Sequence, residues 1–96
     1  MEMTIFKEIA CNGLYQILVW ELGIFPRKIY PSSTLRKDLG LDAVDMEDLG
    51  EAIEKKFKID RIETVRVLAS DIEVEALADF IAEKLYSLAE RKKQTE

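Results

Sequence analysis

Apolar residues recur at three- and four-residue steps in three stretches of this 96-residue chain, and this period restricts those stretches to amphipathic helices. The first stretch predicts one helix from Thr4, its N-cap, to about Leu22, before Gly23. Gly13 weakens its middle by about 1 kcal/mol relative to alanine. Its apolar stripe comprises Ile5, Phe6, Ile9, Ala10, Leu14, Ile17 and Leu18.

Two further helices follow from local signals. Asp42 as N-cap and Asp45 in the first turn predict a helix from Ala43 to Phe57. Its buried stripe would be Met46, Leu49, Ile53 and Phe57 with Val44 at the rim, and its i,i+4 ion pairs Glu51–Lys55 and Glu54–Lys58. The capping-box pattern Ser70-Asp71-Ile72-Glu73 predicts the last helix. Its stripe is Val74, Leu77, Ala78, Ile81, Leu85 and Leu88, before a frayed tail at Arg91, Lys92 and Lys93.

The segments between these helices are irregular or short. Pro26, Pro31 and Gly40 make residues 23–41 a long first loop. We expect it to be ordered, because it carries Ile24, Phe25, Ile29, Tyr30, Leu35, Leu39 and Leu41. Residues 64–67 alternate like a strand, but a lone strand would have no partner, so we favour a short helix or turn within Arg61–Leu68. The expected fold is an all-α bundle of three long helices and a short third element.

Composition limits the function. We expect a single domain over 1–96, with its core at about 4–88 and a charged tail at 89–96. The net charge of −5 argues against nucleic-acid binding, which depends on Lys and Arg neutralising phosphates. The absence of histidine removes the usual general base. One cysteine indicates a reducing cytoplasm, and we expect neither a membrane span nor a secretory signal.

The segment Asp38-Leu39-Gly40-Leu41-Asp42-Ala43-Val44 is the most distinctive motif in the chain. Together with the acidic pattern that runs on to Phe57, it resembles the prosthetic-group attachment motif of acyl carrier proteins, Asp-Leu-Gly-x-Asp-Ser-Leu. The resemblance rests on residues 35–57; the terminal helices match only in position and pattern. Val44 for leucine is a mild departure. Ala43 in place of the serine is a disabling one.

The resemblance implies a function in fatty acid or polyketide biosynthesis, or lipid metabolism more broadly. In the family, the serine carries 4'-phosphopantetheine, whose thiol holds acyl groups as thioesters. Such a carrier is a substrate rather than an enzyme, and we expect a monomer. Position 43 with Asp42 and Val44 would form the attachment site, but the Ala43 methyl group cannot form a phosphodiester. The alanine is either introduced to obtain a homogeneous unmodified protein or natural, in a carrier-like interaction or regulatory module. The otherwise intact motif favours the first explanation, an introduced alanine.

Acidic residues dominate residues 38–54, which hold seven Asp and Glu and no Lys or Arg. The net charge of this segment is −7 and that of the whole chain is −5, so the rest of the chain has a net charge of +2. Family resemblance suggests that basic patches on a phosphopantetheinyl transferase and on acyl-processing enzymes bind here. The alternative is that this acidic helix face is simply exposed to solvent and binds no partner, and the charge pattern alone favours that alternative. The predicted partner-binding residues are Asp38, Asp45, Glu47, Asp48, Glu51 and Glu54.

Other candidate sites are weaker. Ala43, Val44 and Met46 interrupt the ligand register that an EF-hand calcium loop would need. Cys11 has no His or basic cluster nearby in the sequence and is expected to fill the core or a groove. Trp20, Phe25 and Tyr30 are expected to be packing residues rather than a ligand platform. None of Ser32, Ser33, Ser70 and Ser87 is a convincing replacement attachment site.

Overall fold

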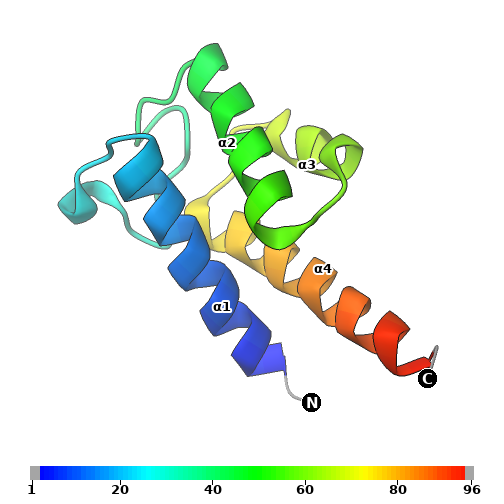
Figure 1. The fold of residues 1–96 in the computed structure, drawn as a ribbon. Helices are drawn as coiled ribbons and strands as arrows, with labels where there is room; N and C mark the ends of the chain where they lie inside the picture. The colour runs from blue at the N-terminus through cyan, green and yellow to red at the C-terminus, as the bar shows by residue number, and fades with distance from the viewer. Residues whose placement is uncertain (1–2, 95–96) are drawn as a thin grey trace.

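The protein is all-α, as predicted: the computed structural model describes residues 3–94, with side chains as far as Arg91, and holds no strand within that range. The α-helices are α1 (Met3–Gln16), α2 (Ala43–Phe57), α3 (Arg61–Leu68) and α4 (Val74–Gln94). A π-helical turn, η1 (Ile17–Glu21), continues α1, and a 3₁₀ turn, η2 (Pro26–Lys28), lies in the first loop. α1 packs chiefly on α4, and α2 on α3 (Figure 1). None of the helices within residues 3–94 combines the length and apolar character that a bilayer crossing requires.

The first helix differs from the prediction in detail. It begins at Met3, so Thr4 lies inside it and is not the N-cap. It ends near Leu22 as predicted, but its last turn is π-helical, with the Leu22 amide donating to the Ile17 carbonyl at 3.0 Å. Gly23 then takes a positive φ of 71°. We expected Ile5 and Ile9 in the buried stripe, but both are exposed. Each lies about 100° around the helix from the buried residue that follows it, which turns its side chain away from the core.

The limits predicted for α2 are confirmed, and of the helix or turn expected within Arg61–Leu68 the structure forms the helix. In α2, Met46, Leu49, Ile53 and Phe57 are buried and Val44 is 64% exposed. The pair Glu51–Lys55 forms at 2.9 Å. The predicted pair Glu54–Lys58 is wrong: Lys58 is the left-handed C-cap of α2, and Glu54 pairs with Arg61 at 3.4 Å. The left-handed turn takes Lys58 off the helical i,i+4 position, and Arg61 at the start of α3 replaces it.

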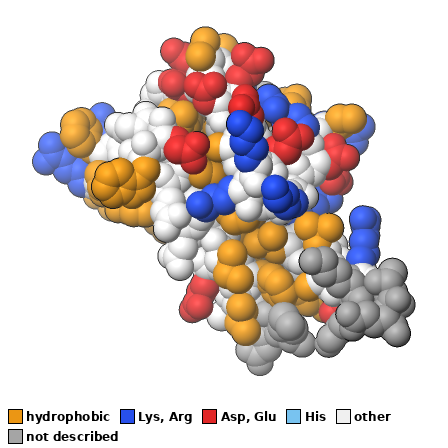
Figure 2. Space-filling view, viewed as in Figure 1, with side chains coloured by type: hydrophobic (Ala, Val, Ile, Leu, Met, Phe, Trp, Pro, Cys, Tyr) orange, Lys and Arg blue, Asp and Glu red, His pale blue; other side chains and the backbone are white. Residues whose placement is uncertain are grey.

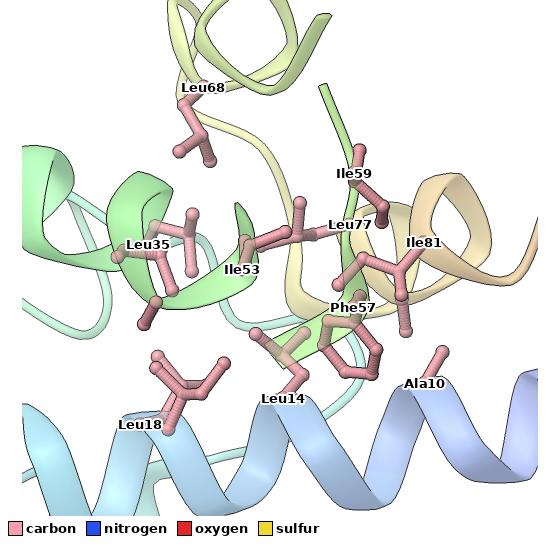
Figure 3. Packing of buried hydrophobic residues seen from close by; sticks show 14 of the residues in the cluster. Ala10, Leu14, Leu18, Leu35, Ile53, Phe57, Ile59, Leu68, Leu77 and Ile81 are labelled. Carbon is pink, nitrogen blue, oxygen red and sulfur yellow. The ribbon is translucent and has the colours of Figure 1, made fainter. Parts of the chain in front are cut away.

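The core lies where α1, α2 and α4 meet, with Leu35 from the first loop and Leu68 from α3 completing it (Figure 3). Gly13 allows the closest approach within it. A β-carbon at this position would collide with the Phe57 ring, lying 2.9 Å from Cε1 and still closer to Cζ. The glycine that weakens α1 as an isolated helix thus creates the room for Phe57.

The first loop is fastened to the start of α4. The Leu35 amide donates to the Ile72 carbonyl at 3.0 Å, and Thr34 and Glu73 form an isolated antiparallel bridge. The amides of Val74 and Glu75 donate to the carbonyls of Ser33 and Pro31, each at 2.9 Å. The predicted Ser70–Glu73 capping box is therefore wrong: α4 begins at Val74, and backbone carbonyls from the loop satisfy its first amides.

Two other expectations also differ. Phe25 and Tyr30 do not pin the loop to the core: they are 61% and 62% exposed, and Trp20 is 81% exposed. α4 continues to Gln94 through the stretch where we expected a frayed tail. Residues 95–96 of that tail lie outside the described residues.

Gly13→Ala should lower the free energy of unfolding by about 1–3 kcal/mol, because Phe57 must move out of its well-packed position. Gly50→Ala is the matched control, since a β-carbon there meets only ordinary contacts, the nearest being Arg61 Nε at 3.5 Å. We expect this variant to be neutral or more stable by up to about 1 kcal/mol. Urea unfolding followed by circular dichroism measures both, and equal effects at the two glycines would contradict the close approach at Gly13.

Candidate functional site

The motif at residues 38–43 forms a tight turn that leads the first loop into α2. Asp38 closes it, because its Oδ2 accepts from the Thr34 amide at 2.8 Å and its own amide donates to Thr34 Oγ1 at 3.2 Å. Leu39 and Leu41 are buried, and Gly40 between them has a φ of 74°, which favours glycine. Asp38 thus has a structural role, and the partner-binding role that we predicted for it stays a prediction.

The N-terminus of α2 carries a complete capping box. Asp42 Oδ1 accepts from the Asp45 amide at 2.8 Å, and Asp45 Oδ2 accepts from the Asp42 amide at 3.1 Å. Asp42 is therefore the N-cap that we predicted, and Asp45 completes the box from the third helical position. Ala43 is exposed as the first residue of the helix, followed by the exposed Val44. A side chain at position 43 is reachable from solvent and lies at the positive end of the helix dipole.

A cavity of about 320 Å³ opens between α2 and α3 beside position 43. Ala43 itself lines it, so the candidate attachment position and the cavity are adjacent. Most of the lining is apolar, with three charged side chains among it. The lining residues are Arg36, Ala43, Met46, Glu47, Gly50, Arg61, Val65, Leu68 and Ala69.

Arg36 and Arg61 are the residues at this cavity that sequence reasoning missed. One Arg36 guanidinium nitrogen, Nη2, donates to the Leu68 carbonyl at 3.1 Å. Arg61 Nη1 lies 3.4 Å from Glu54 Oε1. Arg36 comes from the first loop and Arg61 from α3, so no spacing in the sequence relates either to position 43. The packing of α3 against α2 places Arg61, and the bonds of the first loop to residues 68–71 place Arg36.

Beyond Asp45 of the capping box, the acidic residues of α2 divide between two places. Glu47 lines the α2–α3 cavity, and the half-buried Glu54 pairs with Arg61 close to it. Asp48 and Glu51 instead line a second hollow, against the π-helical turn that ends α1. Lys55 lowers the pKa of Glu51 through a hydrogen bond and its positive charge, and Glu51 raises the pKa of Lys55 in return. Acidic side chains gather over the start of α2 at the top of Figure 2.

Cys11 is exposed on α1 rather than buried. It lines a separate, mostly apolar cavity of about 260 Å³ between α1, the first loop and the start of α4. Lys7 lines the same cavity and pairs with Asp79 at 3.1 Å. Across residues 3–94, no three His, Cys, Asp or Glu residues come together in a group that could hold a metal ion.

No protein-family model matches this chain, and no solved structure matches it significantly.

Asp71 holds the loop that brings Arg36 to the cavity. Its Oδ1 accepts from the Arg36 amide at 2.7 Å and its Oδ2 from the Lys37 amide at 3.2 Å. These bonds, with the Arg36 amide as the largest cause, lower the pKa of Asp71 below its ordinary value of 3.8. The carboxylate form is therefore the one that fastens the loop.

Asp71→Asn should lower the thermal midpoint at neutral pH, because an amide offers one acceptor oxygen where the loop presents two amide donors. Since folding lowers the pKa of Asp71, its contribution is complete well above pH 3.8 and is lost as the pH falls through the lower folded-state value. The stability difference between the two proteins should therefore narrow below pH 3.8, as thermal unfolding by circular dichroism from pH 7 to 3 would measure. A constant difference would contradict this role.

Proposed function

We propose that this chain is an acyl-carrier-like protein in a form that cannot be loaded, whose active form presents thioester-bound acyl groups to partner enzymes. The single observation that carries the proposal is the position of Ala43: it is exposed, it opens the capped helix α2, and it borders a mostly apolar cavity. Its motif supplies each part of this arrangement. The buried leucines fix the turn, and Asp42 fixes the start of the helix.

The residues of this chain do not fit covalent attachment of a 4'-phosphopantetheine arm. Ala43 has no oxygen to form the ester bond, although its surroundings suit a phosphate. Backbone amides and the helix dipole at an N-terminus favour negative charge. A serine at position 43 would present its hydroxyl in that field, and replacing it by alanine in an exposed first turn disturbs a helix little. The loss therefore affects loading and leaves the fold intact.

The α2–α3 cavity supports the assignment of acyl groups as the cargo. Met46, Val65 and Leu68 give it an apolar wall of the kind that shelters hydrocarbon from water. An acyl group attached through an arm at position 43 would have this cavity directly beside its anchor. Burial there would shield a reactive thioester between encounters with partner enzymes.

A second candidate function is a carrier-like interaction or regulatory module that has abandoned the arm. Ala43 itself favours it, because the hydroxyl is absent while the acidic helix face is intact. In this alternative, the exposed Glu47 and Asp48 bind basic partner surfaces without any acyl transfer. The coding sequence of the source gene separates the two candidates: a serine codon at position 43 supports the carrier, and an alanine codon supports the module.

Ala43→Ser should gain the arm when incubated with coenzyme A and a promiscuous phosphopantetheinyl transferase, and intact mass spectrometry would detect the product. The chain with Ala43 should remain unmodified, because it lacks the nucleophilic oxygen. Val44→Ser is the matched control, since it places a hydroxyl on the next exposed residue, about 100° around the helix. We expect no modification of this control.

Two outcomes would count against the carrier. If Ala43→Ser stays unmodified with several transferases, the carrier proposal loses its main support. If the chain with Ala43 gains mass, another side chain is the attachment site and the role of position 43 is wrong.

Glu47→Lys combined with Asp48→Lys in the Ala43→Ser protein should slow arm attachment by roughly 3–10-fold at low salt, because both changes oppose a basic partner surface. Stopped samples weighed over time give the initial rate. Glu8→Lys with Glu83→Lys makes the same change in net charge on α1 and α4 and should slow attachment less. Equal slowing by the two pairs would show that net charge, and not the α2 face, controls the encounter.

A further inference from the structure

The end of the molecule opposite α3 exposes aromatic side chains beside basic ones. We define the aromatic–basic patch as Trp20, Phe25, Arg27, Lys28 and Tyr30. All five residues are exposed, Trp20 to 81%. Figure 1 shows the 3₁₀ turn of Arg27 and Lys28 projecting from the rest of the fold, and Figure 2 shows hydrophobic and basic side chains on that projection.

Local backbone geometry keeps this patch exposed. The π-helical turn ends at Glu21, and Gly23, with its φ of 71°, turns the chain into the projecting loop. Pro26 opens the 3₁₀ turn, and Arg27 lies over the Phe25 ring with 5.8 Å between the guanidinium carbon and the ring centroid. One charge and one apolar ring are thus presented together. An exposed group of large apolar side chains beside basic ones is a mark of an interaction surface.

The positive charge of this region indicates a negatively charged partner. Residues 23–37 contain four basic residues, Arg27, Lys28, Arg36 and Lys37, and no acidic one. The Arg36 guanidinium donates to the Leu68 carbonyl beside the α2–α3 cavity. Arg27 and Lys28 are the basic residues of the 3₁₀ turn that projects (Figure 1). Glu21, the nearest acidic residue in sequence, lines the hollow toward Asp48 and Lys55 of α2. Phe25 and Arg27 therefore present an aromatic ring and a positive charge together, with Lys28 beside them in the same exposed turn.

We propose that the aromatic–basic patch docks on an anionic lipid surface. Trp and Tyr side chains favour the boundary between headgroups and acyl chains, where the ring is sheltered and the polar atom stays hydrated. Arg and Lys are attracted to anionic headgroups. The surface fits a lipid better than an acidic protein, because a flat bilayer accepts a projecting loop without needing a matching pocket. Binding is peripheral and reversible, since few residues take part.

The chain carries its own reporter for the test, because Trp20 is its single tryptophan. Vesicles of phosphatidylcholine with one-third phosphatidylglycerol should shift Trp20 emission to the blue at about 1 mM lipid and should carry the protein with them in flotation. Vesicles of phosphatidylcholine alone should do so at least several-fold more weakly, and high salt should reverse most of the anionic binding.

Arg27→Glu with Lys28→Glu keeps Trp20 as the reporter and should weaken binding to the anionic vesicles by roughly tenfold or more. The matched control is Lys58→Glu with Arg66→Glu, which changes the net charge equally at exposed positions near and on α3. We expect it to keep most of the binding. Phe25→Ala should also weaken binding, by a smaller factor, while circular dichroism checks that each variant folds.

Three results would overturn the proposal. The first is no blue shift and no flotation with anionic vesicles. The second is equal loss of binding in the patch and control pairs, which would reduce the effect to net charge. The third is a blue shift that depends on protein concentration without lipid, which would make a second copy of the chain the occupant of the patch.

Discussion

Leu35 connects the segment before α2 to the segment before α4, and the candidate site at the start of α2 depends on this connection. Its side chain is fully buried among residues of the core, while its backbone bonds in two directions. The Leu35 amide donates to the Ile72 carbonyl just before α4, and its carbonyl accepts from the Leu41 amide just before α2, both at 3.0 Å. A single residue of the first loop thus holds together the segments that lead into two helices, while the capping box and the loop carbonyls set where those helices begin. The capped N-terminus of α2 is placed by this tie and not by α2 alone.

Helix limits were predictable from the sequence where the stop and start signals are local. Asp42 caps α2 through Asp45, three residues away, and Asp60 caps α3 through the amide of Ile62 at 2.8 Å. α2 matches its predicted limits, whereas the Asp60 cap was not predicted and the sequence left a helix or a turn open for residues 61–68. The start of α4 does not match its prediction, because its first amides bond to carbonyls of Pro31 and Ser33, about forty residues earlier in the chain. A capping-box pattern cannot anticipate a long-range partner that replaces it.

Only part of the candidate site was predictable from the sequence. The motif predicted the exposed position 43 and its cap, because both follow from neighbouring residues. Arg36 and Arg61 came to light only in the fold, where α3 lies against α2. Periodicity likewise indicated the buried side of α1 but not its width, so Ile5 and Ile9 were assigned to the core although they are exposed. Apolar character alone also misplaced Trp20, since the chain turns away from the core just after it.

The two proposed surfaces are compatible because their charges are opposite. Residues 38–54 carry −7, whereas the projecting turn carries the positive charges of Arg27 and Lys28. An anionic lipid surface would attract the projecting loop and repel the start of α2, so docking would orient the molecule as well as hold it. α2 and its cavity would then face away from the lipid, toward soluble partners. Because screening by salt acts beyond about 10 Å, this orientation depends on the exposed charges nearest the surface, which are Arg27 and Lys28.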